Sequence, residues 1–365
     1  MDAVNSRRLA LARKCRGMTK RDLAEHARIS TRSLSAYEGG VQEPSQSTLS
    51  RIAESLNFPV EFFRGPDLSE PAELATSFRA LSRLTAQHRD QATGSATLAL
   101  ALSAWIEARF RLPSPDVPRY PDINPELAAD AVREEWGLGE RPIGNMVHLL
   151  EARGVRVFSL IDECHDVDAF SFWHGETPYV FLNTAKSGER GRMDSAHELG
   201  HLVLHRGHAL PSGRVEEQEA NAFAAAFLMP RRSVLAHAPR GGHLADLIRA
   251  KRHWNVAAAN LAYRMHKVGL LTDWQYRTIF VNLSSQGYRN AEPNGIPRET
   301  SQMLGKVFEA LRSEGTHQSD VARELHITVQ DLTRIIFGLV LTPVAGTSRA
   351  DGGGTNIAAP SLRIV

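Results

Sequence analysis

The sequence predicts a mainly helical protein with a small α+β part. Apolar residues recur at helical spacing through most of the 365 residues, with serine, threonine and glycine where helix caps belong. Three short segments between residues 155 and 183 are instead β-branched or alternating, which is typical of strands. A proline-rich segment, residues 112–125, separates two helical regions, so the chain should form more than one domain.

The composition is that of a globular protein, with 42% hydrophobic residues and a net charge of only +2. The charge is uneven, because residues 1–36 hold nine lysines and arginines against three acids, a local net of +6 (9 − 3). This asymmetry indicates an anionic partner such as nucleic acid. Two distant cysteines, Cys15 and Cys164, exclude a cysteine-based zinc site. With no signal peptide and no long apolar segment, we expect a cytoplasmic protein without a membrane partner.

Five segments are expected along the chain. They are an N-terminal helix-turn-helix bundle (1–66), a helical spacer with the proline-rich linker (67–124), a central domain with a short β-sheet (125–240), a helical C-terminal region (241–345) and a flexible tail rich in glycine and serine (346–365).

The first segment contains a helix-turn-helix pattern, "TKRDLAEHARISTRSLSAYEGG", from Thr19 to Gly40. Thr19 and Ser30 are good N-caps for its two helices, and small Ala24 lets the helices approach each other. Hydroxyl and basic side chains at the helix starts suit contacts with phosphates and base edges. The residues expected to contact a double-stranded DNA operator are Lys20, Arg21, Thr31, Arg32, Ser33 and Ser35. A small helical bundle that binds protein is the alternative.

This region resembles the XRE (Cro/C1-type) family of DNA-binding domains. The matching positions are Arg8, Arg13, Gly17, Thr19, Leu23, Ala24, Ile29, Ser30, Leu34, Ser35, Glu38, Gly40 and Pro44. Lys20 and Ala27 depart from the pattern, which usually has glutamine and glycine there, so the operator sequence is not transferable. The resemblance implies DNA binding, and we expect a homodimer because helix-turn-helix proteins commonly read two half-sites.

The central domain contains the segment "DSAHELGHLVLH", from Asp194 to His205. His197 and His201 lie one helical turn apart, so both can hold one metal ion, and Glu198 beside them can act as general base on a metal-bound water. A surface helix rich in histidine is the alternative. We expect Asp194 to cap this helix and His205 to be exposed or to support a ligand.

Zinc needs a third protein ligand, and the acidic segment "EEQEAN" on the next predicted helix offers Glu216, Glu217 and Glu219. The spacing favours Glu217 over Glu219, because Asn221 follows Glu217 by one helical turn and an amide often orients a ligand histidine. A solvated acidic face is the alternative.

Residues 125–240 resemble the ImmA/IrrE family of zinc metallopeptidases. The resemblance rests on Phe181 to Asn183, Arg192, Asp194, His197 to His205, Glu217, Glu219 to Asn221, Phe223 to Ala225 and Phe227 to Pro230. It implies a small zincin fold, Zn²⁺ held by His197, His201 and Glu217, and Glu198 as the catalytic base. It also implies that the strand 177–183 is the sheet edge that aligns an extended substrate. Members with an assigned activity cut a repressor of the XRE type.

The sequence therefore favours a DNA-binding transcriptional regulator with a fused zinc endopeptidase that cleaves a repressor-type protein, or itself, in response to a signal. The first alternative is a regulator whose zincin-like domain is a non-proteolytic sensor or interaction module. The second is a toxin–antitoxin or phage-type regulator that acts only through DNA. Residues 319–338 form a second helix-turn-helix pattern, but Arg334 is the only basic residue of its second helix, so packing or dimerisation is the favoured role.

Overall fold

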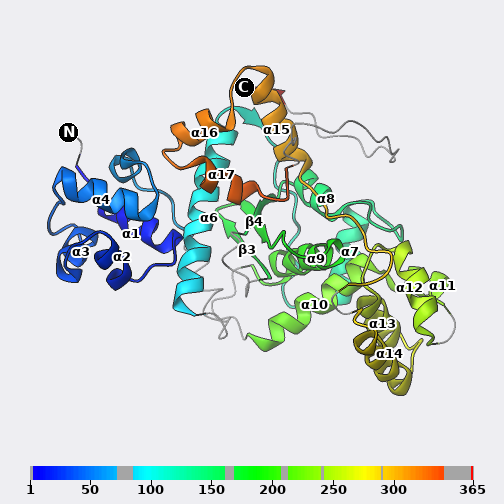
Figure 1. The fold of residues 1–365 in the computed structure, drawn as a ribbon. Helices are drawn as coiled ribbons and strands as arrows, with labels where there is room; N and C mark the ends of the chain where they lie inside the picture. The colour runs from blue at the N-terminus through cyan, green and yellow to red at the C-terminus, as the bar shows by residue number, and fades with distance from the viewer. Residues whose placement is uncertain are drawn as a thin grey trace, which may run out of the picture. The chain divides into compact units, whose positions relative to one another are not determined.

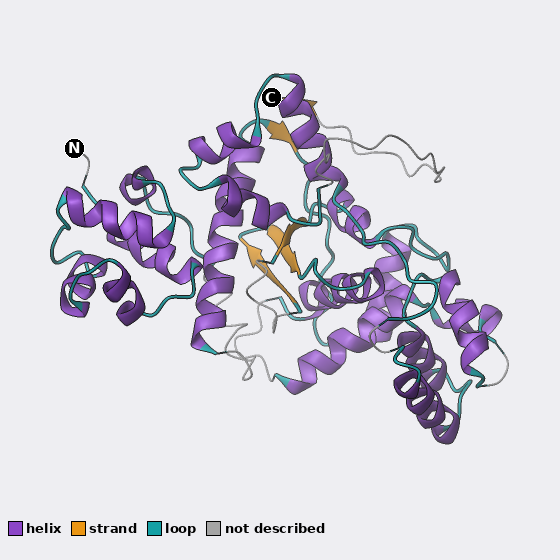
Figure 2. Ribbon diagram, in the orientation of Figure 1, coloured by secondary structure: helices purple, strands orange, loops and turns teal. Residues whose placement is uncertain are grey.

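The computed structural model describes residues 3–71, 85–160, 168–206, 213–239, 242–288, 291–340 and 363–364. The described chain is mainly helical with little sheet, which confirms the predicted fold class (Figures 1 and 2). It divides into unit 1 (Met1–Ser114, Phe158–Val167, Ser301–Val365) and unit 2 (Pro115–Val157, Asp168–Thr300). No described helix is long and apolar enough to cross a membrane.

Unit 1 begins with the helix-turn-helix bundle. Its helices are α1 (Ser6–Cys15), α2 (Lys20–His26), α3 (Thr31–Glu38), α4 (Gln46–Leu56) and the 3-10 helix η1 (Val60–Arg64). Thr19 caps α2 in a capping box with Asp22, and Ser30 caps α3, as the sequence predicts. Ala24 and Leu34 are buried between the helices.

The long helix α6 (Ala86–Glu107) packs against α1 in the same unit (Figure 1). The contact requires a glycine, because a Cβ on Gly94 would lie 2.7 Å from Sγ of Cys15. After α6, strand β1 (Phe110–Arg111) pairs antiparallel with β5 (Arg363–Ile364). Residues 72–84 of the predicted helical spacer, and all of the predicted flexible tail except β5, lie outside the described residues.

The last described helices also belong to unit 1. They are α15 (Gln302–Ser313), α16 (Gln318–Glu324) and α17 (Val329–Ile336). Thr328 caps α17, and His317 is the N-cap of α16. The last two form the second helix-turn-helix pattern. Trp105 Nε1 on α6 and Arg109 Nη2 just after this helix both donate to Glu324 Oε2, at 2.8 and 2.6 Å, so α16 packs beside the end of α6.

A buried ion pair joins the N-terminal bundle to α17. The Arg16 guanidinium makes two hydrogen bonds to the Asp331 carboxylate, at 2.6 and 2.9 Å. Its remaining N–H groups donate to the carbonyls of Leu56 and Asn57, and it stacks over the Phe58 ring. The side chains of Arg16 and Asp331 are 12% and 2% exposed. The Asp331 carboxylate is therefore buried in an ion pair within unit 1, which agrees with a packing role for this second helix-turn-helix pattern.

Unit 2 contains the three-stranded sheet and the two helices that carry the candidate site. Its elements are α7 (Pro125–Glu135), α8 (Met146–Ala152), β2 (Arg156–Ser159, at the unit boundary), β3 (Ala169–His174), β4 (Thr177–Leu182), α9 (Gly188–Leu204), α10 (Arg214–Leu228), α11 (Arg231–His237), α12 (Leu244–Ala250), η2 (Lys251–His253), α13 (Ala258–Lys267) and α14 (Asp273–Ser285).

The strand order of this sheet is β2-β4-β3, and β3 and β4 form an antiparallel hairpin. The expectation that residues 177–183 are the sheet edge is wrong, because β4 is the central strand and lies between β2 and β3. Helix α9 packs on the sheet beside β3, where Trp173 Nε1 donates to the Leu202 carbonyl. The described edge strand nearest to α9 is therefore β3.

The start of α9 is fixed by the segment 291–300. Buried Lys251 bridges Glu189 on α9 and Glu292, at 3.0 and 2.9 Å. Fully buried Arg192 pairs with Glu299 at 2.6 Å. A Cβ on Gly188 would lie 2.6 Å from the Ile296 carbonyl oxygen, so only glycine fits there.

Helix α9 begins earlier than the sequence analysis expects. Ser187 caps it, so the expectation that Asp194 is the cap is wrong. Asp194 lies inside the helix and forms an ion pair with Lys186, with Nζ of Lys186 3.5 Å from Oδ2 of Asp194.

We predict that removing either member of the Arg16–Asp331 pair destabilises unit 1 strongly. Arg16→Ala or Asp331→Ala should each lower the free energy of unfolding by about 3 kcal/mol, because the remaining charge stays buried without its partner. Urea unfolding measures this. The matched control is Arg323→Ala, which removes an exposed pair with Asp320 and should cost less than about 1 kcal/mol. Equal losses for the buried and the exposed pair would contradict the prediction.

Candidate functional site

The candidate site forms where α9 packs closely against α10. Gly200 faces Ala220, and a Cβ on Gly200 would lie 3.2 Å from Cα of Ala220 and from Cδ1 of Phe223. Two small residues at the contact therefore let the helix backbones approach. Phe223 is fully buried beside them.

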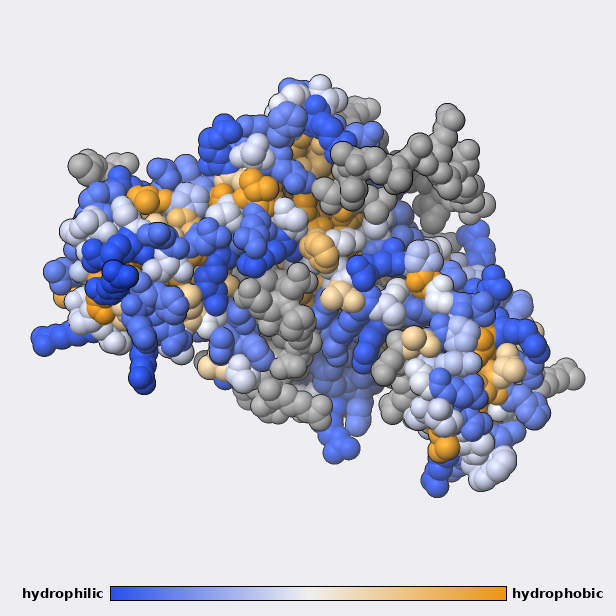
Figure 3. Space-filling model, viewed as in Figure 1, coloured by the Kyte–Doolittle hydropathy of each residue, from blue (hydrophilic) through white to orange (hydrophobic). Residues whose placement is uncertain are grey.

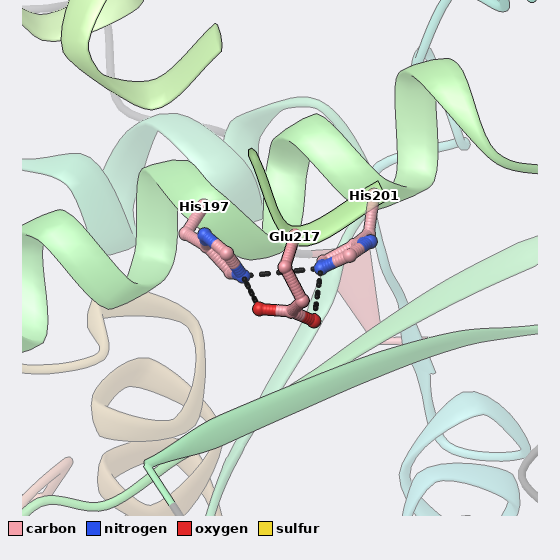
Figure 4. A group of neighbouring side chains, drawn as sticks. All are labelled: His197, His201 and Glu217. Atoms are coloured by element: carbon pink, nitrogen blue, oxygen red, sulfur yellow. Dashed lines mark hydrogen bonds and ion pairs between the residues drawn. The ribbon is translucent and has the colours of Figure 1, made fainter. Parts of the chain in front are cut away.

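Three side chains converge next to this contact, His197 and His201 from α9 and Glu217 from α10 (Figure 4). The two histidine Nε2 atoms are 3.0 Å apart. One Glu217 carboxylate oxygen lies 3.4 Å from Nε2 of His197, and the other lies 3.4 Å from Nε2 of His201. Among the described residues this is the only group with the spacing of a metal site.

The donor atoms fit a zinc ion. A tetrahedral ion with bonds of about 2.0–2.1 Å separates its ligand atoms by about 3.3 Å, close to the spacing between these three groups. Two imidazole nitrogens and a carboxylate oxygen are ligands that zinc takes in catalytic sites, with the fourth position left for water. The side chains of His197, His201 and Glu217 are 16%, 23% and 45% exposed, so the group is partly open to solvent.

The other two acids of the segment 216–219 lie elsewhere. Glu219 is not one of the three converging side chains, and its Oε2 lies 3.0 Å from Nε2 of His205. Glu216 is buried. Asn221 is placed behind His197, with its Oδ1 3.2 Å from Nδ1 and its Nδ2 donating to the Glu217 carbonyl.

His205 is not exposed. Its side chain is only 8% exposed, and its Nδ1 lies 3.0 Å from Nδ1 of His201. The expectation of an exposed histidine is therefore wrong, whereas the alternative expectation, that His205 supports a metal ligand, stays a prediction. His205 lies at the end of α9, one turn beyond His201.

Glu198 is buried on α9 beside His197, and a side chain of the sheet holds its carboxylate. The Ser171 hydroxyl on β3 donates to Oε2 of Glu198 at 2.7 Å. Burial raises the pKa of the Glu198 carboxyl to about 7, against the opposing effects of His197 and of the Ser171 hydrogen bond. A carboxylate with a pKa near neutrality can both accept and return a proton.

Burial and the contacts among the three converging side chains shift their pKa values. The hydrogen bonds to His197 and His201 hold the pKa of Glu217 well below its usual range. Burial lowers the pKa of His201 to about 4, which keeps this imidazole neutral. Burial also opposes charge on His197, but the carboxylates of Glu217 and Glu198 outweigh it and raise the pKa of His197.

Sequence reasoning missed Ser171 and the contact between His205 and Glu219. Ser171 is a polar residue in an alternating strand, and that alternation is a usable signal for a residue on the face opposite Phe170 and Phe172. Which helix packs against that face depends on the tertiary structure, and the local sequence does not show it. The fourteen-residue separation of His205 and Glu219 carries no local signal.

The expected DNA contacts lie at the start of α2 and on α3. Arg21, Thr31, Arg32 and Ser35 are exposed, whereas Ser33 is half-buried and its hydroxyl hydrogen-bonds Ser30 at the helix cap. Lys20 lies 3.4 Å from Glu38, so part of its charge is neutralised. Hydrophilic residues cover most of the bundle on the face drawn in Figure 3.

Two regions of the chain match known protein families, and they contain the expected DNA contacts and the candidate site. Residues 6–67 match the model of a helix-turn-helix domain. Residues 150–266 match the model of the IrrE N-terminal-like domain, a peptidase family. No curated protein matches the chain.

We predict that a large side chain at position 200 separates α9 from α10 and weakens the site. Gly200→Leu should lower the free energy of unfolding by about 1–3 kcal/mol through overpacking and should reduce zinc affinity. Thermal unfolding and zinc titration against a chelator measure the two effects. The matched control is Gly191→Leu on the same helix, where a Cβ meets nothing within 4 Å. The prediction fails if both variants bind zinc like the wild type.

Proposed function

We propose that this chain, which joins a DNA-binding helix-turn-helix domain to an IrrE N-terminal-like domain, is a transcriptional regulator with a zinc-dependent endopeptidase activity. The observation that carries the proposal is the convergence of His197, His201 and Glu217 with buried Glu198 beside them. A scaffold domain has no need of a buried carboxylate at this place, since burial of an acid is costly.

His197, His201 and Glu217 would hold a zinc ion, which would supply Lewis-acid chemistry at the scissile carbonyl and the attacking water. Glu198 accepts a proton from the attacking water at its carboxylate and passes it to the leaving amine. Ser171 fixes the Glu198 carboxylate through Oε2 and leaves the second oxygen for the water. Asn221 accepts from Nδ1 of His197 and so keeps Nε2 turned to the metal.

An extended peptide is the expected substrate. Among the described strands β3 pairs on one side only, with β4, and it carries Ser171 next to Glu198. A substrate strand added to β3 would align a peptide bond along the site by backbone hydrogen bonds. The substrate class we propose is a repressor-type protein, of the XRE type, or a second copy of this chain.

The helix-turn-helix domain directs the chain to double-stranded DNA. We propose that α3 enters the major groove with Thr31, Arg32 and Ser35 toward the bases, while Lys20 and Arg21 contact phosphates. Ser33 contributes less, because its hydroxyl is already bonded to Ser30. A homodimer would read two half-sites.

Glu198→Gln should retain zinc but lose peptide cleavage by at least about 100-fold, because the amide cannot accept the proton from water. Metal analysis of the purified protein and cleavage of candidate repressors measure the two properties. Exposed Glu134→Gln is the matched control. A Glu198→Gln protein that cleaves every substrate as the wild type does would exclude the catalytic assignment. A zinc-loaded wild type that cleaves no candidate, including itself, would favour the sensor function.

Arg32→Ala should weaken binding to a duplex selected from a random pool by about 1–3 kcal/mol, because an exposed guanidinium on the recognition helix is lost. A gel shift at fixed salt measures this affinity. Arg312→Ala removes the same charge from an exposed position on α15 and serves as the control. Equal affinities of the Arg32→Ala variant and the wild type would exclude this orientation of α3.

A further inference from the structure

We infer that Glu219 and His205 form a hydrogen-bonded relay that positions His201 as a metal ligand; this inference rests on the proposed zinc site. The three side chains form a line that leads away from the ligand atoms. Nδ1 of His201 lies 3.0 Å from Nδ1 of His205, and Nε2 of His205 lies 3.0 Å from Oε2 of Glu219. Neither His205 nor Glu219 is one of the three converging groups.

The line fixes which nitrogen of each ring carries a hydrogen. His201 turns Nε2 toward Glu217 and His197, so Nε2 must keep its lone pair for the metal and Nδ1 must carry the hydrogen. Nδ1–H of His201 then donates to Nδ1 of His205. This leaves the hydrogen of His205 on Nε2, where it donates to the Glu219 carboxylate. Each ring nitrogen of His201 and His205 thus has a single role, as hydrogen-bond donor, hydrogen-bond acceptor or metal ligand.

The geometry excludes His205 as a fourth ligand of the same ion. Its Nδ1 faces the side of the His201 ring opposite the ligand nitrogen, and its Nε2 is turned to Glu219. The His205 side chain is 8% exposed, so a donor or acceptor without a partner would be costly there. Glu219 satisfies this buried ring from α10, and its own carboxylate is 42% exposed and remains hydrated.

The relay also explains why two acids of one short segment have separate roles. Glu217 is turned to the ligand nitrogens, whereas Glu219 reaches the end of α9. Partners of this kind typically change metal affinity by about 10–100-fold when they are removed, because the ligand ring loses its orientation and tautomer. His197 has a different support, Asn221, so the loss should act through His201 alone.

The test is zinc affinity of the full chain, measured by chelator competition with zinc alone as the probe. His205→Leu should weaken zinc binding by about 10–100-fold. His205→Asn should restore part of the affinity, because its side-chain oxygen can accept from Nδ1–H of His201. Glu219→Gln removes the charge from a half-exposed side chain and should weaken binding by less than His205→Leu does. His243→Leu, at an exposed histidine of the same unit, should bind like the wild type.

A spectroscopic measurement separates positioning from a general loss of structure. In zinc-loaded wild type, nitrogen–proton NMR of labelled histidines should detect a slowly exchanging hydrogen on Nδ1 of His201. This signal should be lost in His205→Leu and retained in His205→Asn. If the wild type binds zinc but His205→Leu and Glu219→Gln keep its affinity and its proton signal, the relay is overturned. If the wild type binds no zinc, the proposed function itself fails.

Discussion

The candidate site depends on one contact, the close approach of α9 and α10 at Gly200 and Ala220. His197 and His201 stand three residues before and one residue after Gly200. Glu217 and Asn221 stand at the same offsets from Ala220. Residues at these offsets share one side of a helix, so a single backbone contact brings both pairs together. The two histidines, the carboxylate and the amide of the candidate site are thus placed by two residues that have almost no side chain.

This dependence explains what the sequence can and cannot predict about the site. The spacing of His197, Glu198 and His201 is local, so the periodicity of one helix is enough to place them together. The choice between Glu217 and Glu219 is not local, because the two residues point roughly 200° apart around α10 and the rotation of α10 against α9 decides between them. Ala220 is the local signal for that rotation, as a small residue opposite a glycine.

For the sheet and the C-terminal helices, too, the local sequence predicts the elements but not how they pack. Alternation locates β3 and β4 but does not say which of them lies at the edge, since that depends on where β2 joins. The amphipathic pattern locates α16 and α17 but not their partner. Asp331 meets Arg16 across 315 residues, and no local pattern relates the two. Helix types and many helix ends follow from caps and periodicity, with the start of α9 as an exception, whereas the order of strands and the partners of charged groups follow from tertiary packing.

The two histidines of the candidate site are supported in different ways, yet both supports come from α10. Asn221 accepts from His197 directly, and Glu219 reaches His201 through His205. Helix α10 therefore contributes Glu217 and the outer partner of each histidine, while α9 contributes the histidines and Glu198. Glu198 alone is held from elsewhere, by Ser171 on the sheet. A shift of α10 would consequently move Glu217 and the partners of both histidines together and leave the Glu198 carboxylate in place. The packing of α10 on α9 thus determines the geometry of the proposed metal site, whereas the packing of α9 on β3 determines the position of the proposed base.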